Sequence, residues 1–227
     1  MATIGVRMGN QALHDTVRRF GFGERTGIEC PGESPGLVRE VSKWDSFSTT
    51  SVPFGYEITA TPLQLITAFS AIITDGVLVK PKLVHKLVGP DGTIVESFET
   101  PKIVRRSVSS RIARYIAQEA LVGVAEKPSL RRALAGPHRV LGKTGTAKLL
   151  YADRGLYEPG AYLSLFIGAA PASDPQVVAL VMVRRPKASL GYYGAVVSAP
   201  GVGEILTATL AYLEVAPVEQ VALGRGE

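Results

Sequence analysis

Two nearly continuous apolar runs in the last third of the chain constrain its fold most. They span residues 161–170 and 176–185, and a turn rich in proline, serine and aspartate separates them. Runs this short and this apolar are typical of strands with both faces covered. A further strand is expected over residues 139–150 and a closing helix over residues 197–213. We therefore expect an α/β chain of the α+β type, in which helices flank an antiparallel sheet.

The first two thirds of the chain are expected to form helices, long loops and short strands. Apolar residues recur at helical spacing in three segments, residues 4–20, 61–76 and 109–124. Thr61 is expected to cap the second helix, since threonine is a common N-cap residue, and Pro62 suits the first helical position. The inner face of the third helix is expected to carry Ile112, Ile116, Ala120 and Val124. Short strands are expected over residues 77–88 and 93–98.

Composition and charge argue against several classes of protein. With 46% hydrophobic and 20% charged residues, the chain of 227 residues has the composition of a folded domain rather than a disordered one. Its formal net charge is +5, and its basic clusters are short pairs with no interleaved aromatics, which argues against nucleic-acid binding. No apolar stretch reaches the length of a membrane span, and no charged-then-apolar leader precedes the first helix.

The residues that most often bind metals are few and scattered. Cys30 is the only cysteine, so the chain forms no internal disulfide, and we expect that thiol to be structural or incidental. His14, His85 and His138 do not have the spacing of metal ligands. We therefore expect no metal and no cofactor.

The run Lys143-Thr144-Gly145-Thr146 carries the chemistry of the chain. On a strand, Lys143 and Gly145 share one face, and Thr144 and Thr146 share the other. Glycine weakens a strand interior, so its presence points to the close approach of a ligand or of another backbone. Lys-Thr-Gly is also the third motif of penicillin-binding proteins and class A β-lactamases, after Ser-x-x-Lys and Ser-Asp-Asn. The chain contains no Ser-x-x-Lys.

Further motifs lie before and after Lys-Thr-Gly in the order found in one family. They are Phe20-Gly21-Phe22-Gly23, Thr26-Gly27-Ile28, Phe54-Gly55-Tyr56, Thr61-Pro62-Leu63-Gln64-Leu65, Phe166-Ile167-Gly168 and Tyr192-Tyr193-Gly194. Together they make nearly the whole chain resemble the C-terminal part of a class B penicillin-binding protein transpeptidase domain. The resemblance implies a partial transpeptidase domain over residues 1–227, without its N-terminal strands and serine helix. Residues 1–138 would be its helical and loop part, and residues 139–213 its three-stranded core with the closing helix.

The resemblance also implies a reaction and its residues. The family transfers the acyl group of D-Ala-D-Ala stem peptides to cross-link peptidoglycan, and β-lactams trap the acyl-enzyme. Lys143 would hold an active-site hydroxyl, and the hydroxyls of Thr144 and Thr146 would bind the substrate carboxylate. The backbone N–H of Thr146 would be an oxyanion donor. Gly145 would let the substrate backbone lie beside the strand, and Tyr193 would wall the groove, although aromatic packing also explains this tyrosine.

The chain departs from the family pattern in three places. Besides the absent Ser-x-x-Lys, Met1-Ala2-Thr3 stands where the family has Ser-x-Asn, and Glu57 stands where many relatives have glycine. A Ser-His-Asp nucleophile is not indicated either, because no Gly-x-Ser-x-Gly is present.

Three hypotheses follow from these residues. The chain is a D,D-transpeptidase fragment or half of a split enzyme, inactive without a partner that supplies the serine. Alternatively, it is a non-catalytic remnant or binding module that keeps only the carboxylate-anchoring strand, or an unrelated scaffold with a chance motif. The expected partners are stem peptides, β-lactams, and a complementing N-terminal chain or a second copy at an open apolar edge over residues 177–183. Relatives act at the extracytoplasmic face of the inner membrane, which is the location that the resemblance implies.

Overall fold

The computed structural model describes residues 1–151, 155–187, 189 and 191–217, and the chain divides into two compact units. The first unit ends at Arg114 and the second begins at Tyr115. As expected, the structure combines helices with antiparallel sheets. The division expected between residues 138 and 139 separates the chain by its content of helix and strand, and it stays a prediction.

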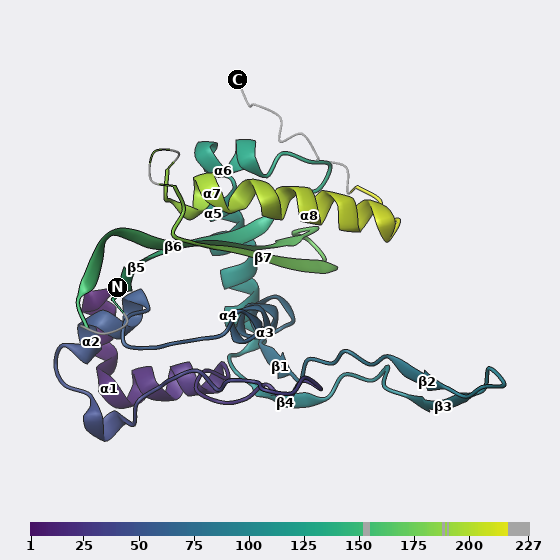
Figure 1. The fold of residues 1–227 in the computed structure, drawn as a ribbon, viewed down its shortest axis with the longest axis horizontal. Coiled ribbons are helices and arrows are strands. Elements are labelled where there is room, and N and C mark those ends of the chain that lie inside the picture. The colour runs from purple at the N-terminus through teal and green to yellow at the C-terminus, as the bar shows by residue number, and fades with distance from the viewer. Residues whose placement is uncertain (152–154, 188, 190, 218–227) are drawn as a thin grey trace. The chain divides into compact units, whose positions relative to one another are not determined.

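The first unit is made of helices, loops and two antiparallel strand pairs. Its elements are α1 (Ala2–Arg19), the short helix η1 (Val41–Lys43), α2 (Ser48–Ser51), η2 (Val52–Phe54), α3 (Pro62–Ile73), β1 (Val77–Val79), β2 (Lys86–Val88), β3 (Ile94–Ser97), β4 (Ile103–Arg106) and α4 (Ser110–Tyr115), whose last residue opens the second unit. Strand β1 pairs with β4 and β2 pairs with β3. Figure 1 shows β2 and β3 at the far end of a ribbon that continues from β1 and β4.

Helix α3 begins where the sequence predicts. Thr61 caps it: its side chain accepts a hydrogen bond from the Gln64 backbone N–H, and the Gln64 side chain accepts one from the Thr61 N–H. This reciprocal pair satisfies two backbone donors that a helix start leaves free. The Gln64 amide also donates to the carbonyl oxygens of Glu24 and Pro35, so the cap ties two preceding loops to the helix.

A small apolar cluster holds α1 to the loop that follows it. Leu13, Trp44 and Val52 are buried there, and Val17 packs against them. Ile4, near the start of α1, is 53% exposed, so not every apolar residue of this helix is buried.

The second unit is a three-stranded sheet with helices packed against it. Its further elements are the π-helix η3 (Ile116–Leu121), α5 (Val122–Ala125), α6 (Pro128–Ala133), β5 (Leu141–Leu150), β6 (Tyr157–Ala170), β7 (Val177–Arg184), α7 (Gly194–Val197) and α8 (Ala199–Tyr212). The strand order is β5-β6-β7 and both pairings are antiparallel. All three strands therefore lie close to their predicted ranges, whereas α6 and β4 are not predicted.

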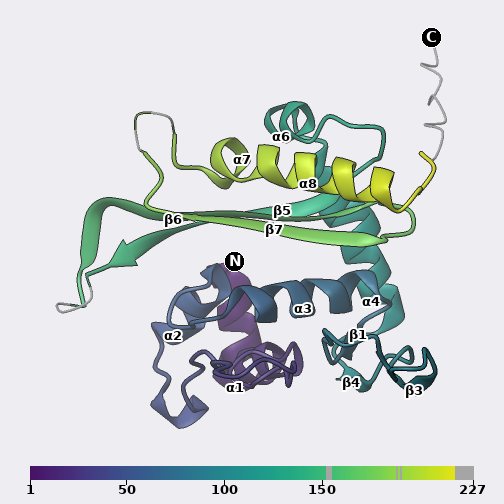
Figure 2. The same ribbon diagram turned by 45° about the vertical axis from the view of Figure 1, so that its right-hand side comes forward.

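The core of the second unit lies between the sheet and α8. Figure 2 shows α8 running along one face of the three strands. Phe166 of β6 is fully buried there, together with Val202, Leu206 and Leu210 of α8. The near-continuous apolar character of β6 follows from this position, because it is the central strand.

The segment from Ser110 to Ala125 is helical, as predicted, but it buries a partly different face. The predicted inner face is only half confirmed, because Ile112 is 46% exposed and Ala120 is exposed, whereas Ile116 and Val124 are partly buried and Val124 packs against the core. The buried residues are instead Ala113, Ala117, Leu121, Val122 and Ala125. Alanine lets a helix approach its neighbours closely, and the π-helical turn changes the angular step between residues, so hydrophobicity alone does not identify the buried side.

No helix among the described residues has the length and apolar character needed to cross a membrane. No group of three His, Cys, Asp or Glu side chains there is arranged to hold a metal ion.

Candidate active site

The Lys-Thr-Gly run lies on β5, at one edge of the sheet. Lys143 pairs with Ile167 of β6, Gly145 with Leu165 and Thr146 with Ser164. Within the described residues β5 has a strand on one side only. An edge strand presents unpaired backbone N–H and C=O groups that can bind an extended peptide.

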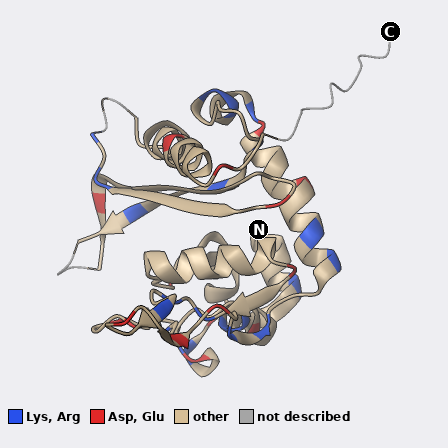
Figure 3. Cartoon of the chain, turned by 90° about the vertical axis from the view of Figure 1, so that its right-hand side faces the viewer, with Lys and Arg blue, Asp and Glu red and all other residues tan. Residues whose placement is uncertain are grey.

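Lys143 is an exposed residue at this edge, but its ammonium group is partly shielded from solvent. Its Nζ donates a hydrogen bond to the Thr144 carbonyl oxygen at 2.7 Å. Partial burial of the ammonium group lowers the pKa of Lys143, and the positive charge of Lys127 lowers it further. Figure 3 shows how few charged residues the sheet carries. From Leu141 to Ala147, Lys143 is the only charged residue.

Thr146 is held next to the start of α7. The Gly194 backbone N–H donates to the Thr146 hydroxyl at 3.4 Å. A Cβ on Gly194 would lie 2.1 Å from the Leu165 carbonyl oxygen and 3.0 Å from that of Gly145. Only glycine therefore allows α7 to begin this close to the edge strand.

Gly145 is required by its neighbour across the sheet. A Cβ there would lie 2.9 Å from the Leu165 side chain, closer than side chains pack. Glycine is therefore needed at position 145 for packing inside the protein, because Leu165 already occupies the space on that side of the strand. The predicted close approach of a ligand is not its only explanation.

Three tyrosines form a stack beside this edge. The Tyr162 and Tyr192 rings are stacked, with centroids 4.1 Å apart, and the Tyr192 and Tyr193 centroids are 4.4 Å apart. The hydrogen bond from Tyr192 to the Tyr193 hydroxyl, 3.1 Å long, and the proximity of Tyr193 raise the pKa of Tyr192 to about 12. Buried Ser164 anchors the stack, because its hydroxyl donates to the Tyr192 carbonyl oxygen.

The predicted site residues on β5 and Tyr193 lie close together in the structure, and contacts from residues without a predicted role hold them there. Lys143, Thr144, Gly145 and Thr146 are consecutive on β5, and 57%-exposed Tyr193 directly precedes the glycine bonded to Thr146. The residues that sequence reasoning missed are Tyr162, Ser164 and Gly194. Their signals are the spacing from Tyr162 to Ser164, which puts both on one face of β6, and the glycine after two tyrosines.

One cavity in the first unit is not a competing site for a peptide. Its volume is about 40 Å³, and its lining includes Phe20, Glu24, Gln64 and Arg105. Pockets for small organic ligands usually measure at least about 300 Å³. A space this small accommodates a water molecule or a small ion rather than a dipeptide.

Curated relatives of this chain are peptidoglycan enzymes and a sporulation protein. Over 217 residues the chain is 33% identical to a probable peptidoglycan D,D-transpeptidase PbpC of Pseudomonas aeruginosa, covering 96% of this chain and 36% of that protein. It is 32% identical to stage V sporulation protein D of Bacillus subtilis, covering 94% and 32%. The chain thus spans about a third of the length of these relatives.

Solved structures give the same result for the fold. Penicillin-binding protein 3 of Mycobacterium tuberculosis, complexed with ampicillin, superposes with a TM-score of 0.85 at 29% identity, covering 97% of this chain and 50% of that one. The transpeptidase domain of penicillin-binding protein 3 from Burkholderia pseudomallei has a TM-score of 0.81 at 25% identity, covering 96% and 62%.

A family model agrees with these relatives. The model of the penicillin-binding protein transpeptidase domain matches residues 1–207 of this chain. Its match contains the Lys-Thr-Gly strand, the tyrosine stack and most of α8. The chain therefore belongs to the family of penicillin-binding protein transpeptidase domains.

Proposed function

We propose that residues 143–146 anchor the C-terminal carboxylate of a D-Ala-D-Ala stem peptide, as part of a D,D-transpeptidase site. The observation that carries the proposal is the edge position of β5, with one cation and two hydroxyls on an otherwise uncharged stretch. A carboxylate at this edge would accept hydrogen bonds from Thr144 and Thr146, and the positive charge of Lys143 would attract it.

The oxyanion role of Thr146 has support from the strand geometry. Alternate residues of an antiparallel strand turn their N–H and C=O groups toward the partner strand, and those between turn them away. The Thr144 carbonyl accepts from the Lys143 ammonium, which fits a carbonyl directed away from β6. Thr146 is two residues on, so its N–H shares that direction and would face a substrate carbonyl at the edge.

The nucleophile has to come from outside these 227 residues. In the proposed reaction a serine oxygen attacks the carbonyl carbon of the penultimate D-Ala, and the terminal D-Ala leaves with a proton on its nitrogen. An amine of a second stem peptide then displaces the serine and restores its hydroxyl. Because the chain has no Ser-x-x-Lys, we propose that alone it binds the carboxylate without forming an acyl-enzyme.

The partners and location are proposed on the same basis. The structure from Mycobacterium tuberculosis holds ampicillin, and we propose that β-lactams bind this chain at β5 once the serine is supplied. The exposed ring of Tyr193 would line the groove. Strand β7 has a neighbour on one side only in the described residues, so a complementing chain or a second copy would pair there. By family, this takes place at the extracytoplasmic face of the inner membrane.

A peptide titration tests the anchoring role. The 227-residue chain is titrated with diacetyl-L-Lys-D-Ala-D-Ala, and binding is followed by NMR shifts of the peptide methyl groups. Lys143→Met should weaken binding at least about tenfold, the effect of losing about 1.4 kcal/mol of attraction between the lysine charge and the carboxylate. Lys148→Met, a change on the same strand, is the matched control and should leave binding unchanged. Equal binding by both variants would contradict the proposal.

A fluorescent penicillin tests the proposed lack of acylation. The unmodified chain should show no covalent label after denaturing electrophoresis, and intact-mass measurement should show no adduct. A stable adduct on any serine would mean that the chain holds its own nucleophile. The non-catalytic alternative is favoured if the peptide still binds in a chain joined to a Ser-x-x-Lys segment but no adduct forms there.

A further inference from the structure

Glu57 adopts a backbone conformation that favours glycine. Its φ is 65°, in the left-handed region that side chains with a Cβ rarely occupy. Such a conformation persists in a folded protein only where the surroundings hold it in place.

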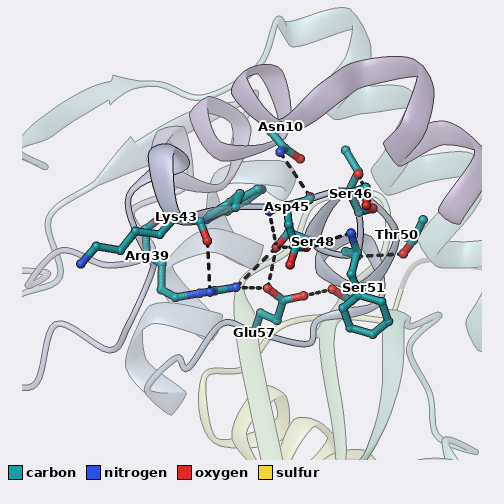
Figure 4. A network of polar contacts seen from close by, with 12 residues as sticks. Asn10, Arg39, Lys43, Asp45, Ser46, Ser48, Thr50, Ser51 and Glu57 are labelled. Carbon is teal, nitrogen blue, oxygen red and sulfur yellow. Dashed lines mark hydrogen bonds and ion pairs between the residues drawn. The ribbon is translucent and has the colours of Figure 1, made fainter.

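The Glu57 carboxylate holds three side chains at once (Figure 4). One oxygen accepts from the Ser51 hydroxyl, and the other accepts from the Ser48 hydroxyl at 2.8 Å and from the Arg39 guanidinium. The Glu57 side chain is only 19% exposed, and both serines are buried. The carboxylate therefore has its partners in a largely water-excluded place, where removing it would leave buried donors unpaired.

Arg39 extends the same network along the loop. Its guanidinium also donates to the Lys43 carbonyl oxygen at 3.2 Å, and its own carbonyl accepts from the Trp44 indole N–H at 3.0 Å. Asp45 completes the arrangement by accepting from the backbone N–H groups of Phe47 and Ser48. Residues 39–57 are thus tied into one closed loop that contains α2.

This loop packs directly against the first half of α1. A Cβ on Gly5 would lie 2.1 Å from the Thr49 carbonyl oxygen, so the helix and α2 touch backbone to backbone. The Asn10 side chain donates to the Asp45 carbonyl oxygen at 3.3 Å (Figure 4). Further along α1, His14 meets the Trp44 ring edge-on, with centroids 5.6 Å apart.

The first half of α1 needs this support. Gly9 breaks the helix, with φ 76° and ψ 165°, so residues 2–8 form a separate short helical piece. A helix of this length is marginal in water without tertiary packing. The contacts with α2 supply that packing.

We propose that Glu57 is a positioning residue, which clamps the loop of residues 39–57 against residues 2–8 and so fixes the start of α1. The inference uses only contacts inside the first unit and does not rest on the proposed function. The carboxylate acts through Arg39, Ser48 and Ser51. The strained left-handed backbone of Glu57 is what allows the side chain to reach these three partners.

Hydrogen exchange of the full chain tests the clamp. In Glu57→Gln the charge is lost while one amide oxygen can still accept, and in Glu57→Gly the strained backbone is relieved but the carboxylate is gone. Both variants should exchange the amides of residues 5–8 at least about tenfold faster. Peptides from α3, in the same unit, should keep their protection, which a general loss of stability would not allow.

Two further variants keep the test decisive. Ser51→Ala removes one of the three partners and should raise exchange in residues 5–8 less than Glu57→Gln does. Glu214→Gly relieves another left-handed glutamate, with φ 55°, in the second unit and should leave residues 5–8 unchanged. Native-like protection of residues 5–8 in Glu57→Gly would overturn the proposal, because glycine would then hold α1 as well as the carboxylate does.

The single tryptophan gives an independent reading of the same loop. Trp44 is buried in the native protein and bonded to Arg39. In Glu57→Gln its emission should shift to longer wavelength and acrylamide should quench it more strongly. An unchanged Trp44 spectrum together with unchanged exchange at residues 5–8 would show that the network does not position α1.

Discussion

The backbone nitrogen of Gly194 lies 3.4 Å from the hydroxyl of Thr146, so the start of α7 and the edge strand β5 are joined at one hydrogen bond. This contact brings Tyr193 next to the Lys-Thr-Gly run, although Thr146 and Gly194 lie 48 positions apart in the sequence. The site is therefore assembled from two segments that are distant in the sequence.

The close approach at Gly194 predicts a costly substitution. Gly194→Ala should lower the free energy of unfolding by about 1–3 kcal/mol, because its Cβ would meet the Leu165 carbonyl oxygen and force α7 away from β5. Urea unfolding measures the change. Gly201→Ala is the matched control, since its Cβ would lie at an ordinary 3.5 Å from Val181, and it should be neutral or stabilising. Equal losses in both variants would show that the contact at Gly194 is not what matters.

The fully buried ring of Phe166 predicts the largest loss of stability in the second unit. Phe166→Ala should cost about 3–5 kcal/mol, the sum of lost apolar burial and the cavity that remains between β6 and α8. Phe54→Ala, at a ring that is 60% exposed, should change stability by less than about 0.5 kcal/mol. Chemical denaturation followed by circular dichroism compares the two, and a similar midpoint for both variants would contradict this account of the core.

The positive charge of Lys127 predicts a shift in the titration of Lys143. Lys127→Met should raise the pKa of Lys143, because one of the two causes that lower it is removed while partial burial remains. Acetylation with acetic anhydride over a range of pH, read by mass spectrometry of the β5 peptide, locates the midpoint. The unfolded chain binds the Lys143 proton more tightly, so the contribution to stability rises with pH from the folded pKa toward 10.5. An unmoved midpoint in Lys127→Met would be evidence against this coupling.

Asp45 predicts a loss of stability in acid. The backbone hydrogen bond from Ser48 lowers the pKa of the Asp45 carboxyl below 3.8, with further help from the Phe47 N–H. Because the folded pKa is depressed, the stabilisation is present above the unfolded value and is lost as pH falls through the folded one. Asp45→Asn should flatten the decline in melting temperature below about pH 4 relative to the native chain. An equally steep decline in Asp45→Asn would contradict this prediction.

The open side of β7 predicts self-association. The chain should elute above its monomer size and become larger with concentration, because an apolar edge strand pairs with other strands. Met182→Lys puts a charge on this strand and should shift elution toward the monomer. A stable monomer at all concentrations of the native chain would contradict the expectation.

The local patterns of the sequence predict the strands, the start of α3 and the Lys-Thr-Gly edge. Period-two alternation, apolar runs and a threonine before a proline act over a few residues, so their consequences are visible without tertiary structure. The three strands of the sheet and the cap at Thr61 therefore match the structure.

Tertiary packing decides what these patterns leave open. The helical segment from Ser110 to Ala125 has apolar residues on more than one side, and close packing buries Ala113, Ala117 and Ala125 rather than Ile112. The left-handed backbone of Glu57 is likewise invisible in the sequence, because only the partners at Arg39, Ser48 and Ser51 make that conformation tolerable. The meeting of Gly194 with Thr146 depends on the path of the whole β6–β7–α7 connection, since backbone contact between distant segments is a property of the folded chain and not of local spacing.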